Sequence, residues 1–350
     1  MTTERHPCRS TRSYSPGTAR AREIGAFAAG PTPPGALVSY VIPPAAREGR
    51  APFRGHETWF RVTGKLPAPG APPRAPLPVV VLHGGPGAAH DYTLAMANLA
   101  SGGRAVVHYD QLGCGRSTHL PEADPASWTV ELFVAELVSL LDHLGLQRVH
   151  VVGQSWGGML GPEFALAHPD RVQSLTICDS PASMTTWREA AEELIDALPE
   201  PHRSDLLRLE AAEAYDDPAY KTATDAFYAR HVCRVQPLPA EVAATFAQIE
   251  AEPTVYHAMN GPSEFTITGS NLTWTVEDRL PGITAPTLVV AGAHDEATPA
   301  CWAPFVERIP DVRSHVFPQS SHMPHVEEHE SFLEVVGGFT AEHDPRGDQQ

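Results

Sequence analysis

The stretch GQSWGG, Gly153 to Gly158, follows directly on the apolar run VHVV (Val149 to Val152) and precedes a helical pattern. A strand-to-helix turn this tight forces its central residue toward positive φ, so the neighbouring residues must lack side chains. Gly153 and Gly157 meet that need and leave Ser155 projecting above the strand. The pattern G-x-S-x-G therefore predicts a nucleophile elbow. A loop serine that merely caps a helix is the weaker alternative.

Apolar strands and helical segments alternate on both sides of this turn. Alternation of this kind implies a mostly parallel central sheet with helices on both faces, an α/β fold. The predicted buried strands are Val79–Leu82, Ala105–Asp110, Arg171–Asp179 and Ala285–Asp295. At the start of the chain, Ala36–Pro43 and His56–Gly64 are predicted to form an antiparallel pair. A helix is expected from Ser127 to Gly145, with Ser127 as its N-cap.

The alternation stops between two strands of the sheet. From about Met184 to Asn271 the pattern is helical and amphipathic, which predicts a helical cap inserted into the core. The predicted organisation is a disordered extension, core, cap, core and a short tail, at residues 1–35, 36–183, 184–276, 277–342 and 343–350. The extension is rich in Arg, Ser, Pro and Gly and lacks the apolar region of a secretory signal.

Composition excludes several classes of function. The 350 residues carry a formal net charge of -17, which disfavours binding to nucleic acid or to an anionic membrane. The five cysteines are scattered without a C-x-x-C pair, so neither a disulfide framework nor a zinc site is expected. No apolar run approaches the ~20 residues of a membrane helix. The natural setting is a reducing cytoplasm.

A serine nucleophile needs a base, and the base needs a carboxylate that orients it. On this type of fold the chain order is Ser, then Asp or Glu, then His. Asp295 follows a predicted strand beyond the cap, and His322 follows the next one. Their rivals are Glu296, His315 on a strand, and His325 and His329 on a helix face expected to be solvated. A metal site at His322, His325 and His329 is disfavoured because no H-E-x-x-H motif is present.

The tetrahedral intermediate of acyl transfer needs donors for its oxyanion. HGGPG (His83 to Gly87) follows a strand at the same edge of the sheet, and the N–H of Trp156 comes directly after the nucleophile. HGGPG lacks the Lys-Ser/Thr of a phosphate-binding loop. Because the nucleophile is serine and not aspartate, the expected reaction is hydrolysis of an ester, amide or peptide, without metal or cofactor.

Five motifs carry a more specific resemblance. Together with HGGPG and GQSWGG, the stretches YDQLGCGRS (Tyr109–Ser117), MNGPSEFTITG (Met259–Gly269) and AGAHDEATP (Ala291–Pro299) resemble the proline iminopeptidase family of α/β-hydrolases. The nearest look-alikes are its tricorn-interacting aminopeptidase branch and the related amino-acid amidases. The likeness runs from about Val38 to Phe339 and includes the cap.

The resemblance implies the α/β-hydrolase fold and a set of site residues. Matched motif by motif, the triad would be Ser155, Asp295 and His322. The oxyanion donors would be the N–H groups of Gly85 and Trp156.

The resemblance also implies how a substrate is held. In this family acidic residues bind the free α-ammonium of the substrate, and they fall on Glu264 and Glu296. The leading hypothesis is a serine aminopeptidase that releases an N-terminal residue, proline among the candidates, from short peptides or amino-acid amides. The alternatives are an amidase or esterase acting on a small metabolite, and a non-catalytic ligand receptor on the same fold.

Overall fold

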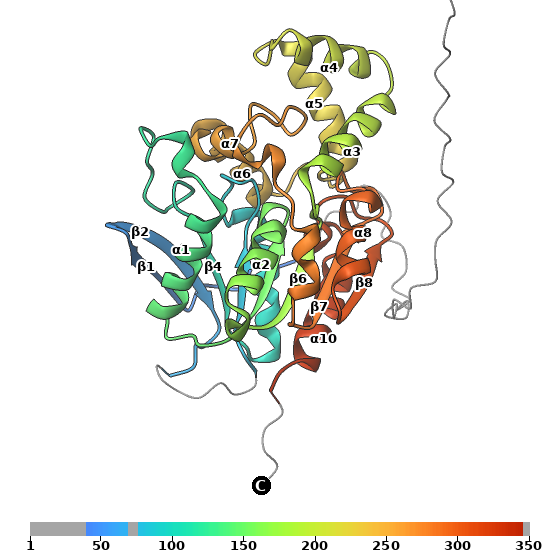
Figure 1. Ribbon diagram of the computed structural model, residues 1–350. Helices are drawn as coiled ribbons and strands as arrows, with labels where there is room; N and C mark the ends of the chain where they lie inside the picture. The colour runs from blue at the N-terminus through green and yellow to red at the C-terminus, as the bar shows by residue number, and fades with distance from the viewer. Residues whose placement is uncertain (1–39, 69–75, 346–350) are drawn as a thin grey trace, which may run out of the picture.

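The computed structural model describes residues 40–68 and 76–345 (Figure 1). An eight-stranded sheet has the strand order β1-β2-β4-β3-β5-β6-β7-β8. The pairs β1–β2 and β2–β4 are antiparallel and the remaining pairs are parallel, so the predicted α/β fold with a mostly parallel sheet is confirmed. The strands are β1 (Arg47–Phe53), β2 (His56–Thr63), β3 (Val79–Leu82), β4 (Val106–Tyr109), β5 (Val149–Gln154), β6 (Val172–Cys178), β7 (Thr287–Gly292) and β8 (Val312–Phe317).

The prediction of a first strand at Ala36–Pro43 was wrong. The strand that pairs with β2 is β1, and residues 40–43 form no strand, while 36–39 lie outside the described residues. β1 (REGRAPF) gives little apolar signal because it is an edge strand that buries only Ala51 and Phe53. A two-residue turn at Arg54 and Gly55, with φ of 49° and 84°, joins it to β2.

Each central strand contributes to two cores, because successive side chains point to opposite faces. Val80 and Leu82 of β3 pack in one core with the apolar sides of three helices, and Val79 and Val81 pack in the other. The first core is covered by α1 (Val130–His143), α2 (Trp156–Ala167) and α8 (Pro299–Arg308). The second is covered by the 3-10 segment η1 (Asp91–Gly102) and by α10 (His329–Glu342), which follows the short α9 (Pro324–Glu327).

The start of α1 also differs from the prediction. Thr129, and not Ser127, is the N-cap, and its hydroxyl accepts a hydrogen bond from the Leu132 N–H at 3.2 Å. Ser127 instead ends a short 3-10 turn, η2 (Pro125–Ser127), which Asp124 caps. Both serine and threonine suit an N-cap, so composition alone did not distinguish the two positions.

Between β6 and β7 the chain leaves the sheet and forms helices α3 to α7. They lie over one end of the sheet in Figure 1. The buried apolar side chains of α4, α5 and α6 form a cluster with Ala88, Tyr92, Met323 and Val326 of the core, while α3 and α7 contribute mainly to the first core. These helices are α3 (Met184–Asp196), α4 (His202–Ala211), α5 (Pro218–His231), α6 (Ala240–Ala251) and α7 (Thr254–Met259).

Two further expectations concern the ends and the surroundings of the chain. The predicted disordered extension, residues 1–35, lies outside the described residues, and the exact division into core and cap stays a prediction. Among the residues that the structure describes, no helix is long and apolar enough to cross a membrane.

Candidate active site

Ser155 lies at the turn between β5 and α2, with φ 55° and ψ −121°. A Cβ on Gly153 would lie 2.0 Å from the carbonyl oxygen of Gly157, and a Cβ on Gly157 would lie 2.0 Å from that of Leu82. Only glycine fits at either position, so the close packing of β5, α2 and β3 fixes the turn. The Ser155 N–H donates to the carbonyl of Cys178 on β6 at 2.9 Å. The strand, turn and helix predicted from GQSWGG are therefore present.

Asp295 and His322 lie on the loops that follow β7 and β8. His322 Nδ1 donates to Asp295 Oδ1 at 2.6 Å, and the Ala297 N–H donates to the same oxygen at 2.9 Å. Both side chains are buried. The carboxylate thus fixes the imidazole ring and leaves Nε2 directed away from it, as a general base requires.

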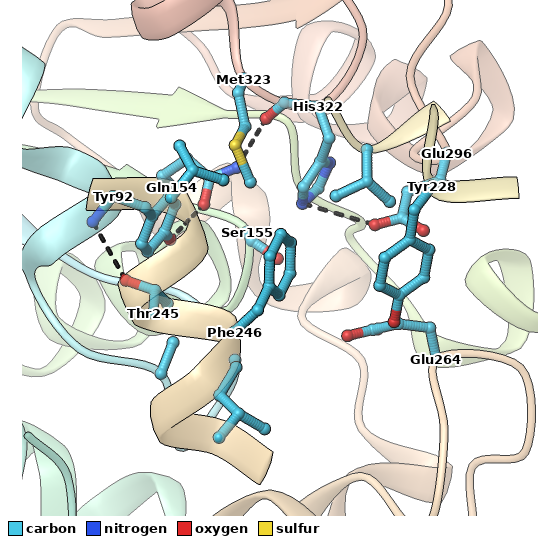
Figure 2. A pocket seen from close by; sticks show the side chains of 15 residues that line it. Tyr92, Gln154, Ser155, Tyr228, Thr245, Phe246, Glu264, Glu296, His322 and Met323 are labelled. Atoms are coloured by element: carbon cyan, nitrogen blue, oxygen red, sulfur yellow. Dashed lines mark hydrogen bonds and ion pairs between the residues drawn. The ribbon is translucent and has the colours of Figure 1, made fainter. Parts of the chain in front are cut away.

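Ser155 and His322 line the same cavity, and both side chains are drawn in it in Figure 2. Between Ser155 Oγ and the His322 ring there is no hydrogen bond in the described part of the chain. In substrate-free enzymes this contact is often long and shortens when substrate binds. The structure therefore brings together the three residues 155, 295 and 322 that the sequence singled out.

The loop that carries His322 is held from both sides by Glu327. The Glu327 carboxylate accepts hydrogen bonds from the N–H groups of Ser321 (2.7 Å) and Met323 (3.2 Å), the two neighbours of His322. It also accepts one from the N–H of Arg234 in the cap at 2.7 Å. Sequence reasoning missed this residue, because nothing in the acidic run VEEHE separates Glu327 from the other two glutamates, Glu328 and Glu330.

Gln154, the last residue of β5, provides a second connection between this strand and the loop that carries His322. Its Nε2 donates to the carbonyl of His322 at 2.8 Å, and its Oε1 accepts from the hydroxyl of Tyr92. The same hydroxyl accepts from the N–H of Gly84 at 2.6 Å. Gln154 and Tyr92 therefore connect the loop that carries His322 to the HGGPG loop. The sequence analysis assigned no role to either side chain.

The HGGPG loop supplies one free donor to the cavity. Because the Gly84 N–H is bound to Tyr92, it is not available to a substrate. The N–H groups of Gly85 and Trp156 have no acceptor within the described residues, and Gly85 lines the cavity with φ 111°. Two free N–H groups next to a nucleophile are the arrangement that an oxyanion hole needs. The geometry thus supports the pair expected from the motifs.

Glu264 and Glu296 both line this cavity. Glu296 Oε1 lies 3.7 Å from His322 Nε2, and Tyr256 hydrogen-bonds to Glu264. Burial raises the pKa of Glu264. Burial also raises the pKa of Glu296 well above its ordinary value, and the charges of Glu264 and Asp295 add to this effect against that of His322. Glu296 is buried and Glu264 is half-buried. Two carboxylates that face one cavity favour a cation between them.

These carboxylates also act on His322. Burial alone would lower the pKa of His322, but the charge and hydrogen bond of Asp295, followed by the charges of Glu296 and Glu264, raise it to about 9. In the free protein the imidazole is thus the counter-ion of the acidic residues. A cationic ligand near the two glutamates would take over that role and leave His322 free to lose its proton.

The cavity is small, and its cap side is mostly apolar apart from Glu264. Its volume is about 50 Å³, and the cap contributes Val232, Val242, Phe246 and Ile249. A larger cavity of about 760 Å³ within the cap shares several of these residues, and Tyr228 and Glu264 with them. A small apolar group therefore fits beside Ser155, with more room in the cap.

The three rival histidines are not among the residues that line this cavity. His325 was expected on a solvated face, but it is fully buried and donates from Nε2 to the carbonyl of Tyr92 at 3.0 Å. His329 Nδ1 lies 2.9 Å from the carbonyl of His325, and His315 lies on β8. The prediction for His325 failed because α9 and the start of α10 pack against η1.

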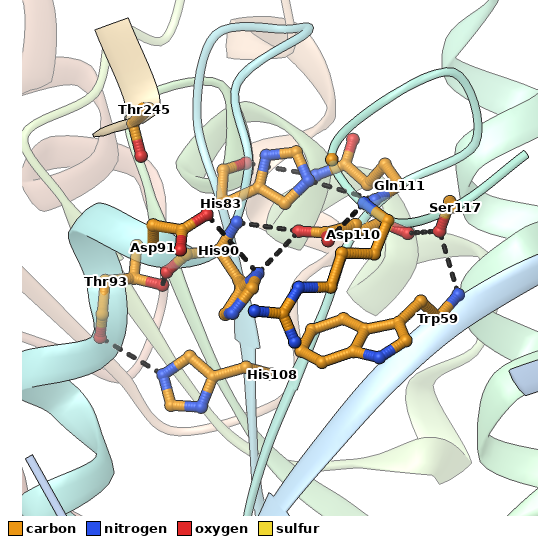
Figure 3. Close-up of polar contacts among 12 residues, drawn as sticks. Trp59, His83, His90, Asp91, Thr93, His108, Asp110, Gln111, Ser117 and Thr245 are labelled. Atoms are coloured by element: carbon orange, nitrogen blue, oxygen red, sulfur yellow. Dashed lines mark hydrogen bonds and ion pairs between the residues drawn. The ribbon is translucent and has the colours of Figure 1, made fainter. Parts of the chain in front are cut away.

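A second buried network of hydrogen bonds, drawn in Figure 3, reaches the HGGPG loop through His83. Asp110 accepts hydrogen bonds from the N–H and Nδ1 of His90, both at 2.8 Å, and from the Arg116 N–H. The Gln111 N–H donates to Nε2 of His83 at 3.0 Å, and burial lowers the pKa of His83 to about 4, so that its ring stays neutral. The motif Tyr109–Ser117 thus fixes the HGGPG loop, and none of its residues lines the cavity.

Comparisons with known proteins agree on one group. A family model described as the alpha/beta hydrolase fold matches residues 78–329. The proline iminopeptidase of Lactobacillus helveticus is 31% identical over 299 residues, which cover 85% of this chain and 98% of that protein. The crystal structure of proline iminopeptidase from Mycobacterium smegmatis is 53% identical, with a TM-score of 0.79, and that of VinJ is 49% identical, with a TM-score of 0.81. Both alignments cover 85% of this chain and 99% of the other chain.

Proposed function

Because this chain belongs to the proline iminopeptidase family of α/β hydrolases, we propose that it is a serine aminopeptidase that removes N-terminal proline from peptides and amides. The observation that carries this proposal is the content of one cavity, which is lined by Ser155, His322 and the carboxylates of Glu264 and Glu296. The first pair suits acyl transfer, and the second pair suits a substrate with a free amine.

In the proposed mechanism Ser155 Oγ attacks the carbonyl carbon of the N-terminal residue while His322 Nε2 takes the hydroxyl proton. Asp295 stabilises the imidazolium, and the N–H groups of Gly85 and Trp156 bind the oxyanion. His322 then gives the proton to the leaving amine, which frees the shortened peptide. Water, activated by the same imidazole, hydrolyses the acyl-enzyme and releases the amino acid.

Glu264 and Glu296 select for a free N-terminus by binding its ammonium group. The positive charge also lies close to His322 and lowers the pKa of the imidazole, so the correct substrate favours the basic form of the catalyst. The apolar residues of the cap accept the side chain. The roof formed by the cap restricts entry to a chain end, which fits exopeptidase action.

We place this activity in the cytoplasm. The cysteines at 114, 178, 233 and 301 are free and buried in the described part of the chain, which suits a reducing compartment. The substrates are short peptides or aminoacyl amides with a free N-terminus.

A matched pair of substrates tests the amine site. Prolyl arylamide and its N-acetylated form present the same arylamide carbonyl, but only the first carries an ammonium group. We expect Glu264→Gln and Glu296→Gln each to lower kcat/KM for the free amine by about thirtyfold or more, mainly through KM, as expected when a buried charge loses its partner. Steady-state kinetics on both substrates measures the effect.

Glu250→Gln is the matched control, since Glu250 lines the larger cavity but is exposed. Its kinetics should equal those of the wild type. Equal wild-type rates on the free and acetylated substrates would refute the role of Glu264 and Glu296 and favour an amidase or esterase of small metabolites.

A further inference from the structure

Asp179 lies beside Asp295, the carboxylate of the proposed triad, and takes no part in the mechanism above. It follows β6, is 1% exposed and has φ 53°, in the left-handed region. Aspartate and asparagine tolerate this region better than most residues. The Asp179 N–H donates to the carbonyl of Val290, and Asp179 Oδ1 accepts from the Gly292 N–H at 3.1 Å. The backbone of β7 thus directs this side chain toward the loop that carries Asp295.

The hydrogen bonds of the two carboxyl groups leave one oxygen on each without a donor. Asp295 Oδ1 accepts from His322 and Ala297, and Asp179 Oδ1 accepts from Gly292. Asp295 Oδ2 and Asp179 Oδ2 are buried and accept from no N–H or O–H of the described residues. Two bare carboxylate oxygens in such a place would repel each other and lack solvation.

A single proton shared by the two carboxyl groups removes both the repulsion and the missing solvation. The side chains of Asp179 and Asp295 are within hydrogen-bonding reach of each other, and a hydrogen bond between two carboxyl groups requires that one of them is protonated. We infer that Asp179 is a neutral carboxylic acid whose Oδ2–H donates to Asp295 Oδ2, and that it acts as a positioning residue for the catalytic carboxylate.

The proton belongs on Asp179 and not on Asp295. Asp295 accepts two hydrogen bonds, one of them short and from an imidazole that carries positive charge, and both stabilise its ionised form. Asp179 accepts one longer bond from a backbone N–H. Burial raises the pKa of Asp179 well above its ordinary value, and the charge of Asp295 raises it further.

The other titratable groups that act on this position do not supply a positive charge. Glu327 on α9 adds negative charge, Cys178 precedes Asp179 on β6, and Tyr92 of η1 is neutral because burial raises the pKa of its hydroxyl. Of the groups in the described ranges that act on Asp179, the Gly292 N–H is thus the one that favours its ionised form.

This assignment rests on the proposed function only for its catalytic consequence. With Oδ2 bound to Asp179 and Oδ1 bound to His322 and Ala297, the carboxylate of Asp295 has a defined orientation and keeps its full charge. The imidazole is then held in the ring position and tautomer that a base for Ser155 needs.

The first experiment measures the proton without using turnover. A carboxyl group that is neutral in the folded protein binds a proton that the unfolded chain releases above the ordinary pKa of aspartate. Stability is thus highest at low pH and is lost as pH rises toward the folded pKa. We expect this in unfolding of the full chain by guanidinium chloride between pH 5 and 7. For each pH unit, the unfolding constant of the wild type should rise by about ten times the factor found for Asp179→Asn.

Asp170→Asn, at an exposed aspartate, is the matched control and should keep the wild-type slope. Equal slopes for the wild type and Asp179→Asn would overturn the inference. This result is independent of whether Ser155 is the nucleophile, so it separates failure of the shared proton from failure of the proposed function.

The second experiment tests the positioning role on prolyl arylamide. An asparagine can keep both hydrogen bonds, so Asp179→Asn should stay within about threefold of the wild-type kcat, with the acid limb of the kcat/KM profile unmoved. Asp179→Gly suits the positive φ but removes the donor, and its kcat should fall about tenfold with little change in KM. A limb that moves to lower pH in Asp179→Asn would mean that a negative charge was removed, and an unchanged kcat in Asp179→Gly would mean that Asp295 needs no such donor. Either outcome refutes the role.

Discussion

Replacing Ser155 by alanine is expected to lower kcat for prolyl arylamide by about six orders of magnitude. Without the hydroxyl no acyl-enzyme forms, and water would have to attack the substrate directly. The free N–H groups of Gly85 and Trp156 and the two glutamates remain, so some acceleration over the uncatalysed reaction persists. The measurement is single-turnover kinetics at high enzyme concentration.

Two controls make this result specific to the nucleophile. Ser101→Ala, at an exposed serine of η1, should leave kcat unchanged. A fluorophosphonate probe should add the mass of one phosphonyl group to the wild type, on the peptide that contains Ser155. It should add nothing to Ser155→Ala. An Ser155→Ala protein that keeps more than about one hundredth of the activity would show that another group attacks the substrate.

The elbow could be predicted from sequence because its cause is local. GQSWGG, the apolar strand before it and the helix after it lie within about twenty residues. Gly153 is required by a contact with Gly157 inside this unit, whereas Gly157 is required by its contact with Leu82 of β3. Asp295 and His322 could be placed because each follows a strand whose carboxyl end must lie at the same edge of the sheet. The only long-range information in this prediction was the rule that the carboxyl ends of parallel strands lie at one edge of the sheet.

The supporting residues could not be found in the same way. Gln154 reaches the carbonyl of a residue 168 positions later, and Glu327 holds the N–H of Arg234, 93 positions earlier. Nothing in the sequence near these residues indicates a partner. In the sequence, Asp179 is a polar residue at the end of a strand. Its positioning role follows only from its location beside Asp295 in the structure. Edge strand β1 was missed for a related reason, since a strand that buries few side chains has a weak pattern.

The second large effect is expected for Asp295→Asn, which should lower kcat by about four orders of magnitude. The imidazole of His322 donates from Nδ1 to Asp295 Oδ1, and the Ala297 N–H donates to the same oxygen. An asparagine that keeps its oxygen toward these donors cannot stabilise the imidazolium with a negative charge. If it turns its amide toward the ring, it favours the tautomer with the proton on Nε2, which cannot accept a proton from Ser155. Asp170→Asn serves as the control for loss of an exposed carboxylate.

The pH profile of this variant tells the two causes of a low kcat apart. The Asp295 carboxylate is the largest influence that raises the pKa of His322 to about 9 against the effect of burial. The acid limb of kcat/KM reports the base of the free enzyme, and removing a negative charge makes His322 easier to deprotonate. The limb of Asp295→Asn should therefore move to lower pH than that of the wild type, measured with the same substrate so that titration of its amine cancels. A limb that stays in place while kcat falls would mean that Asp295 acts only on folding, and one that moves to higher pH would contradict its assignment as the partner of His322.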